Sequence, residues 1–115
     1  MENRRNLIRL EVGDFLEIRA LNEVAMRIQG KSANLTPMGI CFSSEMEWRR
    51  GQVLMIDYFI PQEFDSIKLK VVVVWSEFIN KESGYFCGGQ ILDIEETKAE
   101  KFSSYYNSKI KEKTV

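Results

Sequence analysis

The sequence predicts an all-β fold: a small antiparallel barrel of about six strands, with one helix at its C-terminal end. Apolar and polar side chains alternate along most of the 115 residues, which is the pattern of strands that bury one face. These runs follow one another at short spacing. After Asp93 the apolar spacing changes from the period of a strand to that of a helix.

The predicted strands are short runs in which every second side chain is apolar. In the first run, three apolar side chains alternate with Glu17 and Arg19. Pro61 marks the end of the fourth run, because proline cannot continue a hydrogen-bonded ladder. The runs cover residues 16–20, 26–29, 39–42, 53–60, 67–75 and 84–92.

The fifth run carries a strong strand signal, because its four consecutive valines at 71–74 favour extended backbone. Lys68 and Lys70 occupy the face that we expect to be exposed. In the last run the pair Gly88 and Gly89 indicates a β-bulge or a close backbone approach. The opposite face of the fifth run is predicted to carry Ile67, Leu69, Val71, Val73 and Trp75.

A helix is predicted over residues 93–112. Asp93 followed by Glu96 resembles a capping box at a helix N-terminus. An apolar stripe at helical spacing is expected to face the core, with a docking surface for a partner as the alternative. The stripe consists of Phe102, Tyr105, Tyr106 and Ile110.

The composition argues against several classes of function. Sixteen Lys and Arg against 17 Asp and Glu give a net charge of −1, whereas proteins that coat nucleic acid or anionic lipid need a large positive field. The sequence has no histidine, which removes Ser-His-Asp catalysis and the usual zinc sites. Carboxylates such as Asp57 and Glu77 are scattered without acid/base pairing. We expect no enzyme, no metal and no cofactor.

Cysteine usage and hydropathy predict the compartment. Cys41 and Cys87 lie in apolar runs, where we expect buried thiols and no disulfide. No secretory signal is visible, and no window approaches the roughly 18 apolar residues of a membrane span. We therefore expect a cytoplasmic protein without a membrane span.

Arginines gather ahead of the first clear strand, at Arg4, Arg5 and Arg9. Their guanidinium groups are planar forks of donors that suit phosphate oxygens or the O6/N7 edge of guanine. The alternative is a solvated basic terminus without a ligand.

A polar turn is predicted between the second and third strands. In extended backbone Asn34 and Thr36 point to the same side, and Gly39 leaves room for a ligand to reach the backbone. A turn of these residue types also occurs without any ligand, so the turn alone leaves both interpretations open.

Together these features resemble the two motifs of the PilZ domain. Arg5 and Arg9 fit RxxxR, and residues 34–39 fit (D/N)x(S/T)xxG. The resemblance extends over almost the whole chain, since the later strands and the final helix follow the family's order. It implies a six-stranded antiparallel PilZ-type barrel at residues 10–92, after a flexible arginine-rich segment at residues 1–9.

Many PilZ domains are bacterial receptors for the second messenger cyclic di-GMP, so the resemblance implies this ligand. Arg5 and Arg9 would grip guanine edges and phosphates. Asn34 and Thr36 would bind a guanine or its phosphate, and Gly39 would shape the turn. Thr36 stands where serine is commoner in the family, but it keeps both donor and acceptor.

Other residues refine this prediction. In this family an arginine directly before the motif, here Arg4, goes with two intercalated ligand molecules instead of one. Trp75 could stack on a guanine, with Gly88 allowing a close approach. Alternatively, Trp75 belongs to the core and the glycines form a bulge.

The sequence thus predicts a cyclic di-GMP receptor that acts as an adaptor. The arginine segment would fold over ligand held on the barrel face and signal to a separate effector protein, in motility or biofilm regulation. One alternative is a PilZ-fold protein-interaction module without nucleotide, as in type IV pilus assembly. The other is a small barrel that binds single-stranded nucleic acid, although the net charge of −1 and the core pattern of most aromatics oppose DNA or RNA binding.

Overall fold

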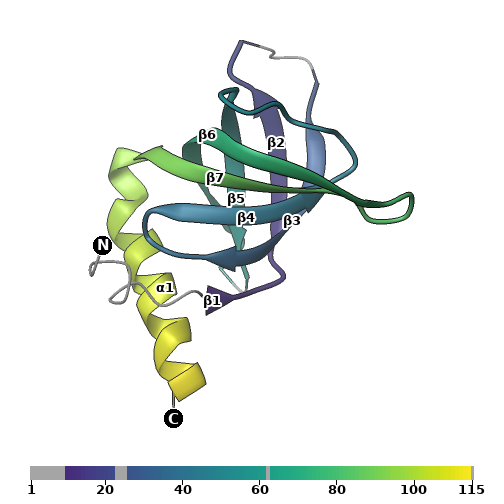
Figure 1. Ribbon diagram of the computed structural model, residues 1–115. Coiled ribbons are helices and arrows are strands. Elements are labelled where there is room, and N and C mark those ends of the chain that lie inside the picture. Colours follow the sequence, from purple (N-terminus) through teal and green to yellow (C-terminus); the bar gives the residue numbers. More distant parts are fainter. Residues whose placement is uncertain (1–9, 23–25, 62, 115) are drawn as a thin grey trace, which may run out of the picture.

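The computed structural model describes residues 10–22, 26–61 and 63–114, which form one closed antiparallel sheet and a C-terminal helix (Figure 1). A 3-10 turn, Glu96–Lys98, leads into helix α1, Ala99–Thr114. The strands are β1 (Leu10–Glu11), β2 (Phe15–Ala20), β3 (Ile28–Leu35), β4 (Gly39–Ser44), β5 (Val53–Ile60), β6 (Asp65–Asn80) and β7 (Gly84–Ile94).

Six of these strands close the barrel in the order β2–β3–β4–β7–β6–β5, and β5 returns to β2. The short strand β1 adds to the end of β3, where Leu10 pairs with Leu35 and Glu11 pairs with Asn34. The predicted six-stranded antiparallel barrel with a C-terminal helix is confirmed.

The core fills the barrel and continues under α1. On β5 every second residue, from Leu54 to Ile60, is buried, as the alternation predicts. The helix stripe also faces the core: the Phe102 ring meets Tyr58 edge-on at 6.0 Å between centroids, and Tyr105 lies 6.2 Å from the same ring. Tyr106 is buried as well, so the core-facing interpretation of this stripe is confirmed for these aromatic residues.

A polar cluster fastens the helix to the barrel. The Tyr58 hydroxyl donates to Asp14 Oδ2 at 2.5 Å, and the Tyr105 hydroxyl of α1 donates to the same oxygen. Ser32 Oγ accepts a hydrogen bond from Asp14 N at 3.0 Å. Burial, together with the hydrogen bond to the Asp14 carboxylate, raises the pKa of both tyrosines above the ordinary value of 10.0.

Several boundaries differ from the prediction, among them those of β3 and of the helix. The strand pattern weakens at residues 30–33, but β3 continues to Leu35 because β2 and β4 supply partners along it. The helix begins at Ala99 instead of Asp93, because β7 continues pairing with β6 as far as Ile94. Asp93 Oδ1 accepts a hydrogen bond from Ile94 N and caps no helix.

Candidate functional site

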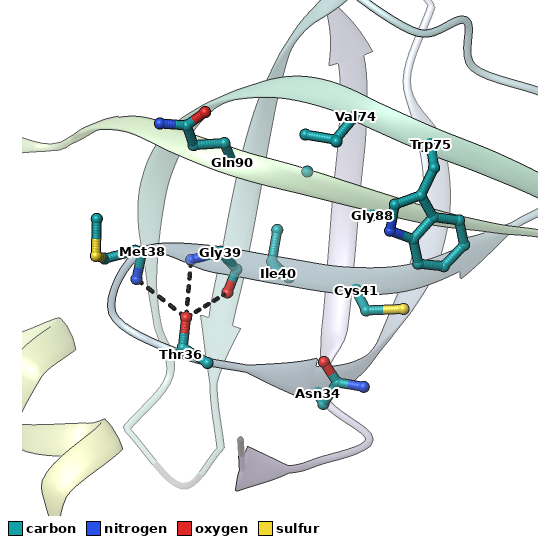
Figure 2. A pocket seen from close by; sticks show the side chains of 11 residues that line it. Asn34, Thr36, Met38, Gly39, Ile40, Cys41, Val74, Trp75, Gly88 and Gln90 are labelled. Atoms are coloured by element: carbon teal, nitrogen blue, oxygen red, sulfur yellow. Dashed lines mark hydrogen bonds between the residues drawn. The ribbon is translucent and has the colours of Figure 1, made fainter. Parts of the chain in front are cut away.

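A cavity of about 320 Å³ opens on the barrel face between the β3–β4 turn and strands β6 and β7 (Figure 2). Its walls come from the segment Asn34 to Cys41, from Val74 and Trp75 on β6, and from residues 88–90 on β7. The fold thus brings the turn motif of Asn34, Thr36 and Gly39 together with Trp75 and Gly88, which the sequence proposed from two other strands.

Thr36 closes the turn at the mouth of the cavity. Its Oγ1 accepts hydrogen bonds from Met38 N at 3.2 Å and Gly39 N at 3.0 Å, and Thr36 N donates to Gly39 O at 2.9 Å. Both lone pairs of the hydroxyl are therefore occupied, whereas its proton faces Gly39 O at a long 3.5 Å. Thr36 can offer a ligand this proton, so it would act as a donor.

Asn34 occupies an irregular position in β3. It pairs with Cys41 of β4 just after a shift of register at Ser32, and with Glu11 of β1 on its other edge. Its side chain lines the cavity, and none of the other described residues hydrogen-bonds its amide. An amide offers two donors and one acceptor oxygen, which suits the polar edge of a base.

A β-bulge in β6 turns Trp75 outward. Val73 pairs with Gly89 and Trp75 with Gly88, so Val74 is an extra residue on β6. The alternation therefore slips by one: Val73 is 2% exposed, while Val74 and Trp75 are 45% and 43% exposed. The prediction that Trp75 belongs to the buried face is wrong. A bulge is present, but its extra residue is a valine opposite the glycines.

The glycines shape the cavity through close approaches. A Cβ at Gly88 would lie 2.1 Å from Trp75 Nε1, so the indole lies directly over this residue. A Cβ at Gly39 would lie 3.1 Å from Gly89 O, which shows how closely β4 approaches β7 there. The missing side chain at Gly88 thus leaves room for the Trp75 indole, which takes the space that the sequence reserved for a ligand, and Gly39 leaves room for the β7 backbone.

The two cysteines have different surroundings, and neither is part of a disulfide. Cys41 is partly exposed and lines the cavity. Cys87 is 1% exposed, and burial, with a smaller contribution from Cys41, raises its pKa to about 12. The prediction of a buried thiol is confirmed for Cys87 and is wrong for Cys41, whose side chain belongs to the candidate site.

The cavity walls carry no charged side chain among the described residues. Arg4, Arg5 and Arg9 lie outside the described residues. An anionic ligand in this cavity would need cations from another part of the chain. The walls also include Met38 and Gln90, which sequence reasoning missed; Gln90 follows Gly88 by two positions, so strand periodicity offered a signal for it.

Neither a cluster of metal-ligating side chains nor a membrane-spanning helix is present among the described residues. They contain no group of three or more His, Cys, Asp or Glu side chains placed to hold a metal ion. Their helix is too short and too polar to cross a bilayer.

Comparison with known proteins gives one informative result. No protein-family model matches the chain, and no curated protein matches it. Among solved structures, it is similar to the Bacillus subtilis inhibitor of motility, MotI/DgrA, with a TM-score of 0.73 and 16% sequence identity. The match covers 96% of this chain and 51% of that protein, so this chain spans about half of its length. At this identity the similarity shows a shared fold.

Proposed function

We propose that this protein is a PilZ-type receptor for cyclic di-GMP that transmits the signal to a separate protein. The observation that carries the proposal is the meeting of Asn34, Thr36 and Gly39 with an exposed Trp75 in one cavity. These residues come from three strands and the β3–β4 turn, and no packing requirement of the core explains an indole that is 43% exposed.

The cavity suits a guanine. The exposed indole of Trp75 provides a stacking face, and stacking on an aromatic side chain contributes about 1–3 kcal/mol per base. The Thr36 proton can be donated to a phosphate oxygen or a guanine acceptor, and the Asn34 amide can pair with the polar edge of the base.

The described walls of the cavity carry no charged side chain, so the positive charge that balances the ligand phosphates has to come from elsewhere. In this proposal the arginine segment supplies it. Arg9 is bonded to Leu10, which pairs with Leu35 beside Thr36. The peptide chain thus tethers the arginines to this edge of the barrel. Arg5 is five positions before Leu10, a reach of at most about 17 Å. Arg4 adds a third guanidinium, which favours two intercalated ligand molecules.

In this proposal the protein signals when bound ligand places the arginine segment, residues 1–9, on the barrel face. Ligand on the barrel face would draw residues 1–9 over it, and the covered face would form a new surface for an effector protein. The similar structure is named as an inhibitor of motility, which supports motility control as the output here. A cyclic dinucleotide is an intracellular messenger, so this function takes place in the cytoplasm.

Calorimetric titration of cyclic di-GMP tests the proposal. We expect wild type to bind and Arg9→Ala to bind about tenfold or more weakly, because charge-assisted hydrogen bonds to phosphate or guanine are lost. Arg27→Ala is the matched control, since Arg27 pairs with Glu17 at 3.2 Å at the opposite end of β3. Absence of heat with wild type would overturn the proposal and favour a protein-interaction module.

A further inference from the structure

The β4–β5 loop carries two arginines, Arg49 and Arg50, that the proposed function has not used. Both are exposed, and within the described residues neither forms an ion pair. By contrast, Arg27 and Lys68 both lie against the carboxylate of Asp57, at 3.7 Å and 3.2 Å. Two adjacent guanidinium groups without a carboxylate partner repel each other, so their placement calls for an explanation.

The loop is held firmly against the barrel. Arg49 N donates to Gln52 Oε1 at 3.0 Å, and Gln52 N donates to Arg49 O at 3.0 Å. Gly51 N donates to Val73 O at 2.7 Å, and Val73 N donates to Gln52 O at 2.9 Å. The turn that presents both arginines is therefore fixed to β6, two residues before Trp75.

Trp48 anchors the other side of the loop. Its side chain is 4% exposed, and its Nε1 donates to Ser44 Oγ at 3.1 Å. A buried tryptophan directly before the arginines, with the hydrogen bonds of Gln52 after them, leaves little freedom for the backbone between. The arginine side chains thus extend from a fixed backbone, so little backbone entropy is lost when they bind a ligand.

The arginines border a second hollow, of about 420 Å³, that adjoins the candidate site. Val74 and Trp75 are walls of both hollows, so the bulge in β6 separates them. Glu47 is the carboxylate among the described walls of this second hollow, against Arg49 and Arg50. The hollow therefore has an excess of positive charge, unlike the neutral walls of the first.

Ser76 contributes to the same hollow. Its Oγ is buried and has no hydrogen-bond partner among the described residues. A buried hydroxyl without a partner is rare in folded proteins, and a water molecule or a ligand group is the usual explanation. Rotation about χ1 moves a serine hydroxyl among three staggered positions, so an oxygen-rich ligand in the hollow could satisfy it.

We infer that Arg49 and Arg50 bind a phosphate group of the ligand whose guanine stacks on Trp75, from the side of Trp75 away from Thr36. The inference rests on the proposed function. In a cyclic dinucleotide each ribose is linked to two phosphates, and in this inference one of them lies toward each hollow. The N-terminal arginines bind the phosphate near Thr36, and the arginines of the β4–β5 loop bind the other phosphate.

The test compares two double variants that each remove two positive charges. In Arg49→Gln/Arg50→Gln we expect cyclic di-GMP to bind about tenfold or more weakly, because bidentate guanidinium–phosphate contacts are lost. In Arg27→Gln/Lys68→Gln, whose side chains pair with Asp57, we expect the affinity of wild type within about twofold. Equal melting temperatures without ligand establish that both variants are folded.

The possible results separate the two proposals. Wild-type affinity in Arg49→Gln/Arg50→Gln would overturn the role of the loop and leave the receptor function standing. An equal loss in both double variants would also overturn it, because it would show a general effect of charge. No binding by wild type would overturn both proposals. Arg49→Lys/Arg50→Lys keeps the charge, and affinity between wild type and the Gln variant is expected because lysine cannot form the bidentate contact.

Discussion

The Trp75 indole lies directly over Gly88, and its outward position depends on that glycine. A methyl group at residue 88 would lie 2.1 Å from Nε1 and 2.3 Å from Cε2, distances that no packing tolerates. The bulge at Val74 turns the indole away from the core, and the glycine gives it a place against the barrel wall. A large apolar ring is thus held at the border of two hollows, one neutral and one positively charged.

Replacing Trp75 by alanine is expected to weaken cyclic di-GMP binding without unfolding the barrel. The side chain is 43% exposed, so its removal costs little core packing, whereas stacking on a base contributes about 1–3 kcal/mol. Titration calorimetry should show affinity reduced about 5-fold to 100-fold. Trp75→Phe should recover most of it, and a Trp75→Ala protein that binds like wild type would remove Trp75 from the site.

Gly88→Ala tests whether the glycine acts through the indole. The added methyl group displaces the ring, so we expect an affinity close to that of Trp75→Ala. In a Gly88→Ala/Trp75→Ala protein the two effects should not add, because both remove the same stacking face. Additive losses in this double-mutant cycle would mean that Gly88 contacts the ligand independently.

Tyr105→Phe is expected to loosen helix α1 from the barrel. It removes the hydrogen bond to the Asp14 carboxylate, and hydrogen bonds to charged groups stabilise by about 1.5–3 kcal/mol. The folded state raises the pKa of Tyr105, so its stabilisation is complete below pH 10 and is lost as the pH rises above that value.

Urea unfolding between pH 7 and pH 11 measures this effect. The free energy of unfolding of wild type should fall steeply above pH 10. That of Tyr105→Phe should be lower at pH 7 and should fall less above pH 10. Tyr85→Phe, on the β6–β7 hairpin, is the control and should follow the wild-type curve. A Tyr105→Phe protein with the full alkaline loss of wild type would contradict the proposed cause.

Asp65→Asn should reduce the loss of stability that acid pH causes. Asp65 accepts hydrogen bonds from Lys101 Nζ at 2.7 Å and Lys98 Nζ at 2.8 Å, and these hold its pKa below the ordinary 3.8. The stabilisation is present above about pH 3.8 and is lost as the pH falls below it. Thermal melts from pH 6 to pH 2 should show a smaller acid loss for Asp65→Asn than for the control Asp93→Asn.

Cysteine labelling provides a direct probe of the cavity. Cys41 lines it, whereas Cys87 is 1% exposed with a pKa near 12, so a maleimide at neutral pH should modify Cys41 much faster. Cyclic di-GMP should slow this reaction. In Cys41→Ser the fast phase should disappear. Rapid labelling of Cys41→Ser would show that Cys87 is the reactive thiol.

Most of the architecture could be predicted because the alternation of apolar and polar side chains in each strand identifies the face that is buried. The alternation around Leu54 and Ile56 identifies the core without any tertiary information, since a strand has a side-chain period of two. The predicted start of the helix was wrong because a tertiary contact outweighed a local signal. The Asp93–Glu96 pattern is a valid local capping signal, but the partner strand at Lys70 holds Asp93 in β7.

The sequence by itself determined most of the buried strand positions, Trp75 and Cys41 excepted, and which motif residues carry hydrogen-bonding groups, because both depend on residue type and short-range periodicity. Only the tertiary structure decided that Trp75 faces outward: the glycine pair indicated a bulge in the last strand, but the extra residue lies on β6, which only the pairing of the two strands determines. The same holds for Arg49 and Arg50: their place beside Trp75 comes from the pairing of the β4–β5 loop with β6, a contact between segments more than twenty residues apart in the chain.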